Sequence, residues 1–300
     1  MTAPGFRCGY IALVGRPNVG KSTLLNRLLG QKISITSKRP QTTRHRILGI
    51  KTLGTAQFVY VDTPGLHRYA GRAMNRQMNR EATRALQEVD VVVFMVEGLR
   101  WTEDDDLVLK ELASVSRPVV LAVNKVDLIS DKQSLLPGLQ SLSQKRDFAQ
   151  IIPLSASKGQ NVAELEAVIE SLLPESGPFF PEDQVTDRSE RFLVAERVRE
   201  KLFRKLGKEL PYGLTVEIER FRRERNIIHI HALIWVERQS QKAIVIGRQG
   251  RVLKEVGREA RTEIESLLDS RVNLKLWVKV KEGWADDERA LRSLGYLDED

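Results

Sequence analysis

Residues 15–22 place two glycines, a lysine and a hydroxyl at the spacing of a loop that binds phosphate groups. Apolar residues before this segment predict a buried strand, and residues 22–29 after it predict a helix. The backbone N–H groups of such a loop and of the helix N-terminus attract anions. We therefore expect Lys21 to reach the β- and γ-phosphates of a nucleotide and the Ser22 hydroxyl to bind Mg²⁺. A glycine-rich turn without a ligand is the alternative for an isolated motif, but further motifs follow.

A second motif, Asn-Lys-Val-Asp at residues 124–127, follows the apolar run 118–123 and is expected at the carboxyl end of a strand. The Asp127 carboxylate only accepts hydrogen bonds, and guanine offers N1–H and its N2 amino group side by side. Adenine lacks this pair of donors. With ATP bound, the Asp127 carboxylate would stay buried without partners, which costs more than about 1–3 kcal/mol. Asn124 is expected to tie the base edge to the loop, and the stem of Lys125 to cover the base. An exposed turn is the alternative for this motif taken alone.

Three shorter segments add to these motifs. The segment Asp62-Thr63-Pro64-Gly65 ends an apolar run, so its carboxylate is placed to orient Mg²⁺ through water and its glycine N–H to approach the γ-phosphate. A polar stretch before it offers a threonine hydroxyl for the same ion, with Thr43 preferred and Thr42 as the alternative. The small residues Ser155 and Ala156 allow a backbone N–H to reach the guanine O6.

These motifs, in this order on successive strand ends, resemble the translation-factor-related GTPases from residue 8 to about residue 173. Small signalling GTPases usually carry a glutamine after Asp-x-x-Gly, but this chain has Leu66 there, and an apolar side chain cannot orient the attacking water. GTPases with this substitution and an asparagine in the phosphate loop tend to use a potassium ion. The resemblance therefore implies GTP or GDP with Mg²⁺ as ligands and K⁺ at Asn18. A simple turn residue is an equally good interpretation of Asn18.

The resemblance assigns three overlapping groups of residues. Nucleotide binding is assigned to Gly15, Arg16, Pro17, Asn18, Val19, Gly20, Lys21, Ser22, Thr23, Asp62, Thr63, Pro64, Gly65, Asn124, Lys125, Asp127, Ser155 and Ala156. Catalysis is assigned to Lys21, Thr43, Gly65 and Asn18, and Mg²⁺ binding to Ser22, Thr43 and Asp62.

Composition narrows the remaining possibilities. The 300 residues suggest about two domains, and the net charge of +8 indicates a polyanionic partner, either nucleic acid or an anionic lipid surface. The chain lacks an apolar run of about 18 residues, so we expect no membrane-spanning helix. The single cysteine excludes an internal disulfide, and we expect no secretory leader because the first residues contain Pro4, Arg7 and Cys8 instead of a long apolar stretch. The expected location is the cytoplasm.

The chain is expected to divide near residue 174. Strands and helices alternate up to residue 173, which predicts an α/β domain over residues 1–173 with a mostly parallel sheet and helices on both faces. Three prolines and one glycine follow within residues 174–183, so residues 174–188 are predicted to be a linker. Phe179 and Phe180 are expected to hold this linker against one of the domains. Residues 189–300 form the predicted second domain.

The second domain differs from the first in its order of elements. The predicted order is α-β-β-α-α-β, with a Gly-x-x-Gly turn at residues 247–250. A polar hairpin turn is expected over residues 220–226, and a final helix over residues 284–296. His229 and His231 lie two residues apart in a predicted strand and so share one face, which is either solvated or directed toward RNA.

This order resembles a KH domain of type II topology, which is a smaller α+β domain that holds about four nucleotides of single-stranded RNA. Two glycines allow the nucleic-acid backbone to approach without meeting a Cβ. Ile244, Ile246 and Val252 are candidates for the apolar groove wall, although they are equally compatible with the core. The candidate RNA-binding residues are Lys242, Ile246, Gly247, Arg248, Gln249, Gly250, Arg251 and Lys254.

A P-loop GTPase domain followed by a KH domain, at this length, resembles the Era family of bacterial GTPases. We expect a monomeric cytoplasmic switch whose turnover is slow, because no residue is an obvious general base. The resemblance implies that a potassium ion stimulates GTP hydrolysis. It implies binding to 16S ribosomal RNA near its 3′ end, a role in maturation of the small (30S) subunit, loose inner-membrane association and no DNA partner. Two alternatives remain open: a protein that binds GTP but barely hydrolyses it, and a membrane-associated regulatory GTPase whose basic surface binds anionic lipid.

Overall fold

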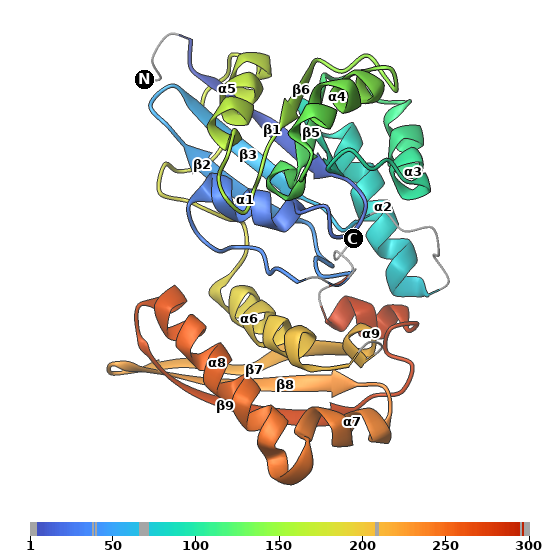
Figure 1. Cartoon of the computed structure of the whole chain (residues 1–300). Helices are drawn as coiled ribbons and strands as arrows, with labels where there is room; N and C mark the ends of the chain where they lie inside the picture. The colour runs from blue at the N-terminus through green and yellow to red at the C-terminus, as the bar shows by residue number, and fades with distance from the viewer. Residues whose placement is uncertain are drawn as a thin grey trace. The chain divides into compact units, whose positions relative to one another are not determined.

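A computed structural model describes residues 5–37, 39, 41–65, 72–207, 210–294 and 296. The chain forms two compact units, one of Met1–Gly71 with Asn75–Asp187 and the other of Arg188–Asp300 with Arg72–Met74 (Figure 1). Leu66, on which the predicted lack of a catalytic glutamine depends, lies outside the described residues.

The first unit contains a six-stranded sheet in the order β2-β3-β1-β4-β5-β6. Its strands are β1 (Arg7–Val14), β2 (Ile47–Thr52), β3 (Ala56–Asp62), β4 (Val91–Glu97), β5 (Val119–Asn124) and β6 (Gln150–Pro153). Only β2 runs antiparallel to its neighbour, β3, while the other neighbouring pairs in this sheet are parallel. The predicted mostly parallel α/β sheet is therefore confirmed.

Helices cover both faces of this sheet (Figure 1). One core cluster joins the strands to α1 (Lys21–Leu29) and α5 (Val162–Leu172). The other joins them to α2 (Ala73–Gln87), α3 (Glu103–Leu112) and α4 (Leu135–Ser143). Short 3₁₀ turns lie at Val126–Leu128 and Lys132–Ser134. Because both faces of the sheet are buried, its strands read as continuous apolar runs in the sequence.

Gln57 attaches the segment after α5 to the first unit. Its side-chain oxygen accepts hydrogen bonds from the N–H groups of Phe179 at 2.7 Å and Phe180 at 2.9 Å. Its amide nitrogen donates to the carbonyl of Phe180 at 2.8 Å. The ring of Phe179 also stacks on Tyr10, with 5.5 Å between ring centroids. The two phenylalanines therefore hold residues 174–187 on the first unit, to which this segment belongs.

Cys8 lies at the same place and is fully buried. Its thiol donates to the side-chain oxygen of Gln57, with 3.7 Å between sulfur and oxygen. Burial raises the pKa of the Cys8 thiol. The group is therefore a small apolar neighbour within this core and is held in its protonated form.

The second unit has the predicted order α-β-β-α-α-β. Its elements are α6 (Glu190–Lys205), β7 (Leu214–Glu224), β8 (Ile227–Val236), α7 (Gln239–Ile246), α8 (Arg251–Leu268), β9 (Arg271–Val280) and α9 (Glu288–Ser293). Short 3₁₀ turns lie at Leu210–Gly213 and Arg248–Gly250. Strand β8 is central, antiparallel to β7 and parallel to β9. One face of this sheet packs on α6 and α8 around a single core cluster, which confirms the α+β topology of a type II KH domain.

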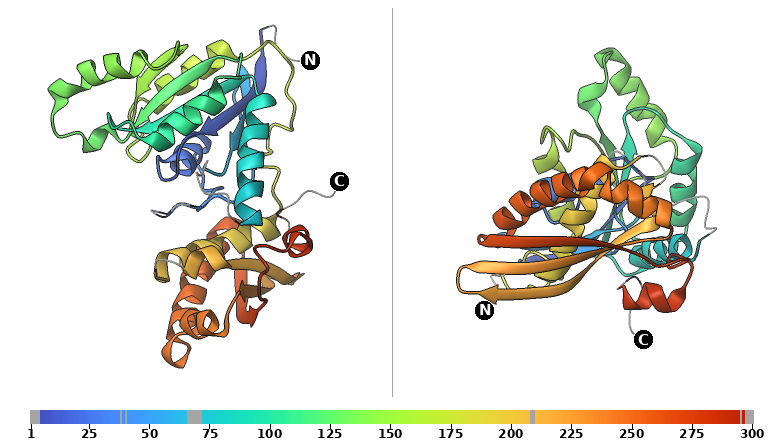
Figure 2. Two further views of the ribbon diagram at one scale, coloured as in Figure 1. Left: turned by 90° about the vertical axis from the view of Figure 1, so that its right-hand side faces the viewer. Right: turned by 90° about the horizontal axis from the view of Figure 1, so that it is seen from below.

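Two sequence predictions for this unit are wrong in their boundaries. The polar segment expected as a turn continues β7 to Glu224, so only two residues connect β7 and β8. The right-hand view of Figure 2 shows the resulting long hairpin. A bulge between Ile218 and Arg220 shifts the register, and cross-strand pairing then extends to the tip. The final helix is also shorter than expected: among the described residues of 284–296, helix is found over Glu288–Ser293.

None of the helices in the described residues combines the length and the apolarity that crossing a membrane requires.

The Gln57 contacts predict how the substitution Gln57→Leu would behave. Leucine leaves two backbone N–H groups without their acceptor, so we expect the free energy of unfolding to fall by about 3 kcal/mol. We also expect faster proteolysis within residues 177–183. Chemical denaturation and limited proteolysis measure the two effects. Gln140→Leu, at an exposed position of α4, is the control. Equal behaviour of the two variants would contradict the role assigned to Gln57.

Candidate nucleotide-binding and RNA-binding sites

The predicted phosphate and base motifs lie at one edge of the first sheet. Gly15 follows the last residue of β1, while Asp62 and Asn124 are the last residues of β3 and β5. The parallel register aligns Leu13 of β1 with Asp62 of β3. The carboxyl ends of parallel strands meet at this edge, which is where open α/β sheets bind ligands. Motifs that are far apart in the sequence thus face the same space.

Two glycines of the phosphate loop are required by close contacts. A Cβ at Gly15, where φ is 150°, would lie 2.5 Å from the carbonyl oxygen of Met95. A Cβ at Gly20, where φ is 109°, would lie 2.3 Å from the amide nitrogen of Asn124. Gly65 also fits closely, because its Cβ would lie 3.1 Å from the backbone nitrogen of Pro17. The Asp-x-x-Gly segment therefore packs directly against the phosphate loop.

Asn18 adopts the left-handed conformation with φ of 67°, and its side chain is exposed. Asparagine tolerates this conformation better than most residues. The backbone alone thus gives a reason for asparagine here, while the exposed side-chain oxygen remains accessible to a cation.

Lys21 is the buried cation of this edge. Its ammonium group donates to the carbonyl of Gly15 at 2.9 Å and to that of Arg16 at 3.2 Å. Burial lowers the pKa of Lys21 to about 8, although the nearby Asp62 acts in the opposite direction. The loop therefore holds Lys21 in place and makes its charge costly, and a bound polyphosphate would relieve that cost.

Asp62 collects hydroxyl groups from three segments of the chain. One of its oxygens lies 3.0 Å from the hydroxyl of Ser22, 2.8 Å from that of Ser34 and 3.3 Å from that of Thr43. The hydroxyls of Ser22 and Thr43 are 2.8 Å apart. Thr42 donates instead to the carbonyl of Arg39 at 2.7 Å. Of the two candidate threonines, Thr43 is thus the one placed beside Ser22 and Asp62.

This group of oxygens suits Mg²⁺. Hard oxygen ligands from hydroxyls and carboxylates are those that Mg²⁺ prefers. The second oxygen of Asp62 is buried and has no hydrogen-bond partner among the described residues. Burial raises the pKa of Asp62, while Lys21 and the three hydroxyls oppose this change. A divalent cation beside Ser22 and Thr43 would stabilise the ionised form.

Asn124 connects the base motif to the phosphate loop. Its amide nitrogen donates to the carbonyl of Val19 at 2.7 Å, and its side-chain oxygen accepts from the N–H of Ala156 at 2.9 Å. Asn124 is almost fully buried, so both contacts are shielded from water. One side chain thus fixes the distance between the loop and the Ser155–Ala156 segment.

Asp127 fits the predicted recognition of guanine. One of its carboxylate oxygens is buried without a hydrogen-bond partner among the described residues. Such an atom costs free energy unless a ligand supplies a donor. Guanine N1–H and the N2 amino group are a pair of donors of the right kind for one carboxylate.

Three acidic and hydroxyl residues of this edge escaped the sequence analysis. Glu97, at the end of β4, binds Lys125 at 2.9 Å and Arg16 at 3.2 Å, and Asp105 binds Arg16 at 3.3 Å. Burial acts to raise the pKa of Glu97, but the two cations outweigh it and lower the pKa. The position of Glu97 at a strand end was the available signal. Ser34 gave none, because it lies in a segment without periodicity.

The Gly-x-x-Gly turn of the second unit joins α7 to α8. A Cβ at Gly247 would lie 2.5 Å from Cγ2 of Val252, whereas a Cβ at Gly250 would have nothing within 4 Å. Both glycines have φ of 74°, and Gln249 between them is left-handed and exposed. Gly247 is thus needed for packing, while the backbone at Gly250 is open to a ligand.

The predicted groove residues also divide into one that is exposed and two that pack on the core. Ile244 is 52% exposed, so it is not a core residue, whereas Ile246 and Val252 pack partly against the core. Arg248 and Lys254 are exposed beside the turn, and Arg251 is exposed and 3.8 Å from Glu255. The turn therefore presents an apolar side chain and several cations together.

Comparisons with known proteins agree with this geometry. Residues 10–125 match the family described as 50S ribosome-binding GTPase, and residues 209–285 match the KH domain family. The GTPase Era of Ectopseudomonas mendocina is 60% identical over 296 residues, which cover 99% of each chain. The chain belongs to the Era family of GTPases. The GTPase Era of Pseudomonas putida is 58% identical over 292 residues, or 97% of each chain.

Two solved structures are similar over nearly the whole chain. One is Aquifex aeolicus Era, as a variant bound to GDP and AlF₄⁻, and the other is Era with MgGDPNP and nucleotides 1506–1542 of 16S ribosomal RNA. Each has 39% sequence identity and a TM-score of 0.93, and covers 97% of this chain and 99% of its own. The family and the two-domain fold expected from the motifs are thus confirmed.

The pKa of Lys21 predicts proton uptake on nucleotide binding. At about pH 9 Lys21 of the nucleotide-free chain is mostly neutral, and anionic phosphates should restore its proton. Calorimetry of GDP binding in two buffers of different ionisation enthalpy measures this uptake, which should approach one proton. Lys21→Arg keeps its proton throughout and should show none. Equal uptake in both proteins would contradict the assignment.

The lowered pKa of Lys21 also affects the free energy of unfolding of the chain without nucleotide. Between pH 8 and 10.5 the folded chain binds fewer protons at Lys21 than the unfolded chain does. Lys21 therefore makes the free energy of unfolding rise with pH in this window.

Proposed function

We propose that this chain is a GTP-hydrolysing switch that binds 16S ribosomal RNA near its 3′ end and assists maturation of the small ribosomal subunit. The observation that carries the proposal is the pairing, in one Era-family chain, of an open Gly-x-x-Gly turn with a phosphate-loop edge where one Asp127 oxygen has no partner among the described residues. The related Era structure bound to MgGDPNP and 16S ribosomal RNA nucleotides supports both ligands. The proposal includes a monomeric cytoplasmic protein with loose inner-membrane association and no DNA partner, as the family resemblance implies.

Each motif has a defined task in this proposal. Lys21 and the N–H groups of the phosphate loop hold the β- and γ-phosphates, and the N–H of Gly65 approaches the γ-phosphate. Mg²⁺, held at Ser22 and Thr43 and oriented by Asp62, would neutralise phosphate charge. Asp127 accepts the two guanine donors. The small residues Ser155 and Ala156 leave room for the guanine O6, while the N–H of Ala156 itself donates to Asn124. These contacts stabilise charge that develops as the terminal phosphate leaves.

Hydrolysis is proposed to be a direct attack of water on the γ-phosphate. In the described part of the site, no side chain is placed as a general base, since Lys21 is a cation and Asp62 faces the hydroxyl groups. Slow intrinsic turnover follows from this arrangement. We propose that a potassium ion at Asn18 adds positive charge beside the phosphates, in the manner of an arginine finger.

GTP is proposed to order the segments around Thr43 and residues 62–65, which hydrolysis then releases. The contacts of these segments include the Thr43 hydroxyl at Ser22 and Asp62, the Thr63 hydroxyl at the carbonyl of Leu13, and the close approach of Gly65 to Pro17. Loss of the terminal phosphate and displacement of Mg²⁺ would remove the ligands that hold them.

The potassium site can be tested without straining the loop. Asn18→Gly removes the side-chain oxygen but keeps a residue suited to φ of 67°. Asn18→Asp keeps an oxygen ligand. We expect wild-type GTP hydrolysis to be faster in K⁺ than in Na⁺ under matched ionic strength, the Asp variant to keep this ratio, and the Gly variant to lose it. Steady-state phosphate release measures the rates. Undiminished stimulation in Asn18→Gly would contradict the proposed ion site.

RNA binding is best tested at Gly250. Gly250→Asp places a carboxylate in open space where a phosphate would approach, so RNA affinity should fall at least tenfold while GTP hydrolysis is kept. Gly247→Asp is less informative, because its Cβ would meet Val252. Filter binding with a single-stranded oligomer of the 16S 3′ end measures the affinity. Gly54→Asp, at an open position of the first unit, is the control.

The same experiment separates RNA from lipid. Vesicles that contain anionic lipid should not compete with the RNA oligomer at physiological salt if the Gly-x-x-Gly turn is an RNA site. Efficient competition, together with unchanged RNA affinity in Gly250→Asp, would favour a membrane-surface role instead.

A further inference from the structure

The sheet of the second unit has a second face that its core helices do not cover. Ile228, Ile230 and Ile234 of β8 point toward α6 and α8 and are buried. Because side chains alternate along a strand, His229 and His231 point to the opposite face. The outer face, as we use the term, consists of Arg220, Arg222, His229, His231, Asn273, Lys275 and Trp277.

Pairing between strands arranges this outer face in rows. Arg222 of β7 pairs with His229 of β8, which pairs with Asn273 of β9. The next row joins Arg220, His231 and Lys275 in the same way. Each row thus presents a cation, an imidazole ring and a polar or basic side chain to the same space.

An exposed tryptophan follows these rows. Trp277 is 41% exposed, and its ring centroid lies 4.9 Å from that of His231 at an angle of 62°. Rings on an open sheet face are the surface on which unpaired bases stack in several RNA-binding folds. The indole of Trp277 and the imidazole of His231 together give this face an aromatic surface.

The charge of the outer face favours a polyanion. Lys275 makes no ion pair with any described residue, and the neighbouring Arg271 makes none either. Glu224 lies 3.2 Å from Arg222, 3.7 Å from Arg220 and 3.8 Å from His229. Glu217 pairs with Leu233, which pairs with Trp277, so one carboxylate lies in the row of Trp277. Arginine and lysine side chains therefore outnumber carboxylates around His229, His231 and Trp277, as in grooves that follow a nucleic-acid backbone.

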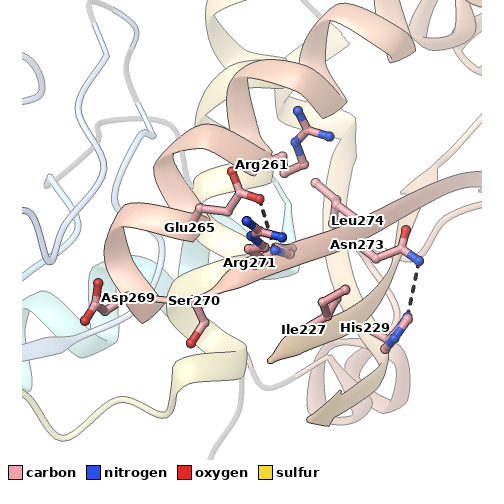
Figure 3. A pocket seen from close by; sticks show the side chains of 10 residues that line it. Ile227, His229, Arg261, Glu265, Asp269, Ser270, Arg271, Asn273 and Leu274 are labelled. Carbon is pink, nitrogen blue, oxygen red and sulfur yellow. Dashed lines mark hydrogen bonds between the residues drawn. The ribbon is translucent and has the colours of Figure 1, made fainter. Parts of the chain in front are cut away.

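A hollow of about 840 Å³ opens at the start of β9 and connects this face with α8. Arg261 and Glu265 of α8 line one side, and His229 and Asn273 line the other (Figure 3). The amide nitrogen of Asn273 lies 3.2 Å from the ring nitrogen of His229. Because β9 is the edge strand, the hollow passes around the edge of the sheet.

We propose that the outer face is a second site for single-stranded RNA, reached from the Gly-x-x-Gly turn along α8 and around the start of β9. Bases would stack on Trp277 and His231, and phosphates would lie near Lys275 and Arg271. Helix α8 has 18 residues and begins at the turn, so about 27 Å of helix separates the turn from the start of β9, and Trp277 lies six residues further along that strand. An RNA that occupies both must be several nucleotides longer than the four that the turn holds. This inference rests on the proposed RNA-binding function.

Oligomer length separates the two sites. The full chain is titrated with single-stranded RNAs of four and about twelve nucleotides, both from the 3′ end of the segment bound to the related Era. Trp277→Ala should weaken binding of the longer RNA about tenfold and leave the shorter unchanged. Trp277→Phe, which keeps a ring, should restore most of the affinity. Lys275→Glu should reduce the slope of log affinity against log salt for the longer RNA by about one to two.

Matched controls remove an exposed ring or a charge from the first unit. Phe179→Ala deletes a ring that is 46% exposed, and Lys110→Glu makes the same charge change as Lys275→Glu. Thermal melting checks that each variant folds. Photo-crosslinking of the longer RNA should label the peptide that contains Trp277 in the wild-type protein, including when Trp277→Ala fails to fold.

The outcomes distinguish the inference from the function on which it rests. Equal affinities of Trp277→Ala and Phe179→Ala for the longer RNA, or crosslinks confined to residues 247–250, would overturn the second site. Displacement of the longer RNA by duplex RNA as well as by single strands would also overturn it, since paired bases cannot stack on the outer face. Failure of the wild-type chain to bind either oligomer would instead overturn the proposed function.

Discussion

The buried carboxylate of Asp62 is the contact on which the nucleotide edge depends. Burying an ionised group is costly unless partners surround it, and here the partners come from three places: the start of α1, the segment at Ser34 and the segment at Thr43. Ser34 and Thr43 lie outside helices and strands, so their shared acceptor at the end of β3 sets where each can lie. Lys21, also buried, balances the charge.

Asn124 plays the corresponding part for the base. It joins a carbonyl of the phosphate loop to an N–H of the last motif, so phosphate and base contacts belong to one rigid arrangement. Glu97 extends this arrangement through Arg16 of the loop and Lys125 of the base motif. A ligand that fits only one half of the site therefore meets a second half that cannot adjust independently. The second unit contrasts with this design, because its candidate RNA surface consists of exposed side chains on helices and strands.

Sequence predicted the features that depend on residue type at fixed spacing. The glycines of the phosphate loop and the strand-end position of Asn124 follow from motifs of fixed spacing, whereas the structure was needed to place Thr43 rather than Thr42 beside Asp62. Contacts made by ordinary residues could not be predicted, because nothing in the local sequence marks Ser34 as a partner of Asp62. The length of β7 was missed for a different reason: a polar exposed strand with a bulge has the same composition as a turn. The outer face became visible only when the strand register placed His231 beside Trp277.

The position of the single cysteine makes this chain convenient to study by spectroscopy. Cys8 is shielded from solvent and held as a thiol, so a maleimide dye would react slowly with it. A cysteine introduced at a chosen surface position would consequently carry almost all of the label without removal of the native residue. Fluorophores or spin labels placed singly or in pairs could report distances within each unit, and between them, in an otherwise unaltered protein.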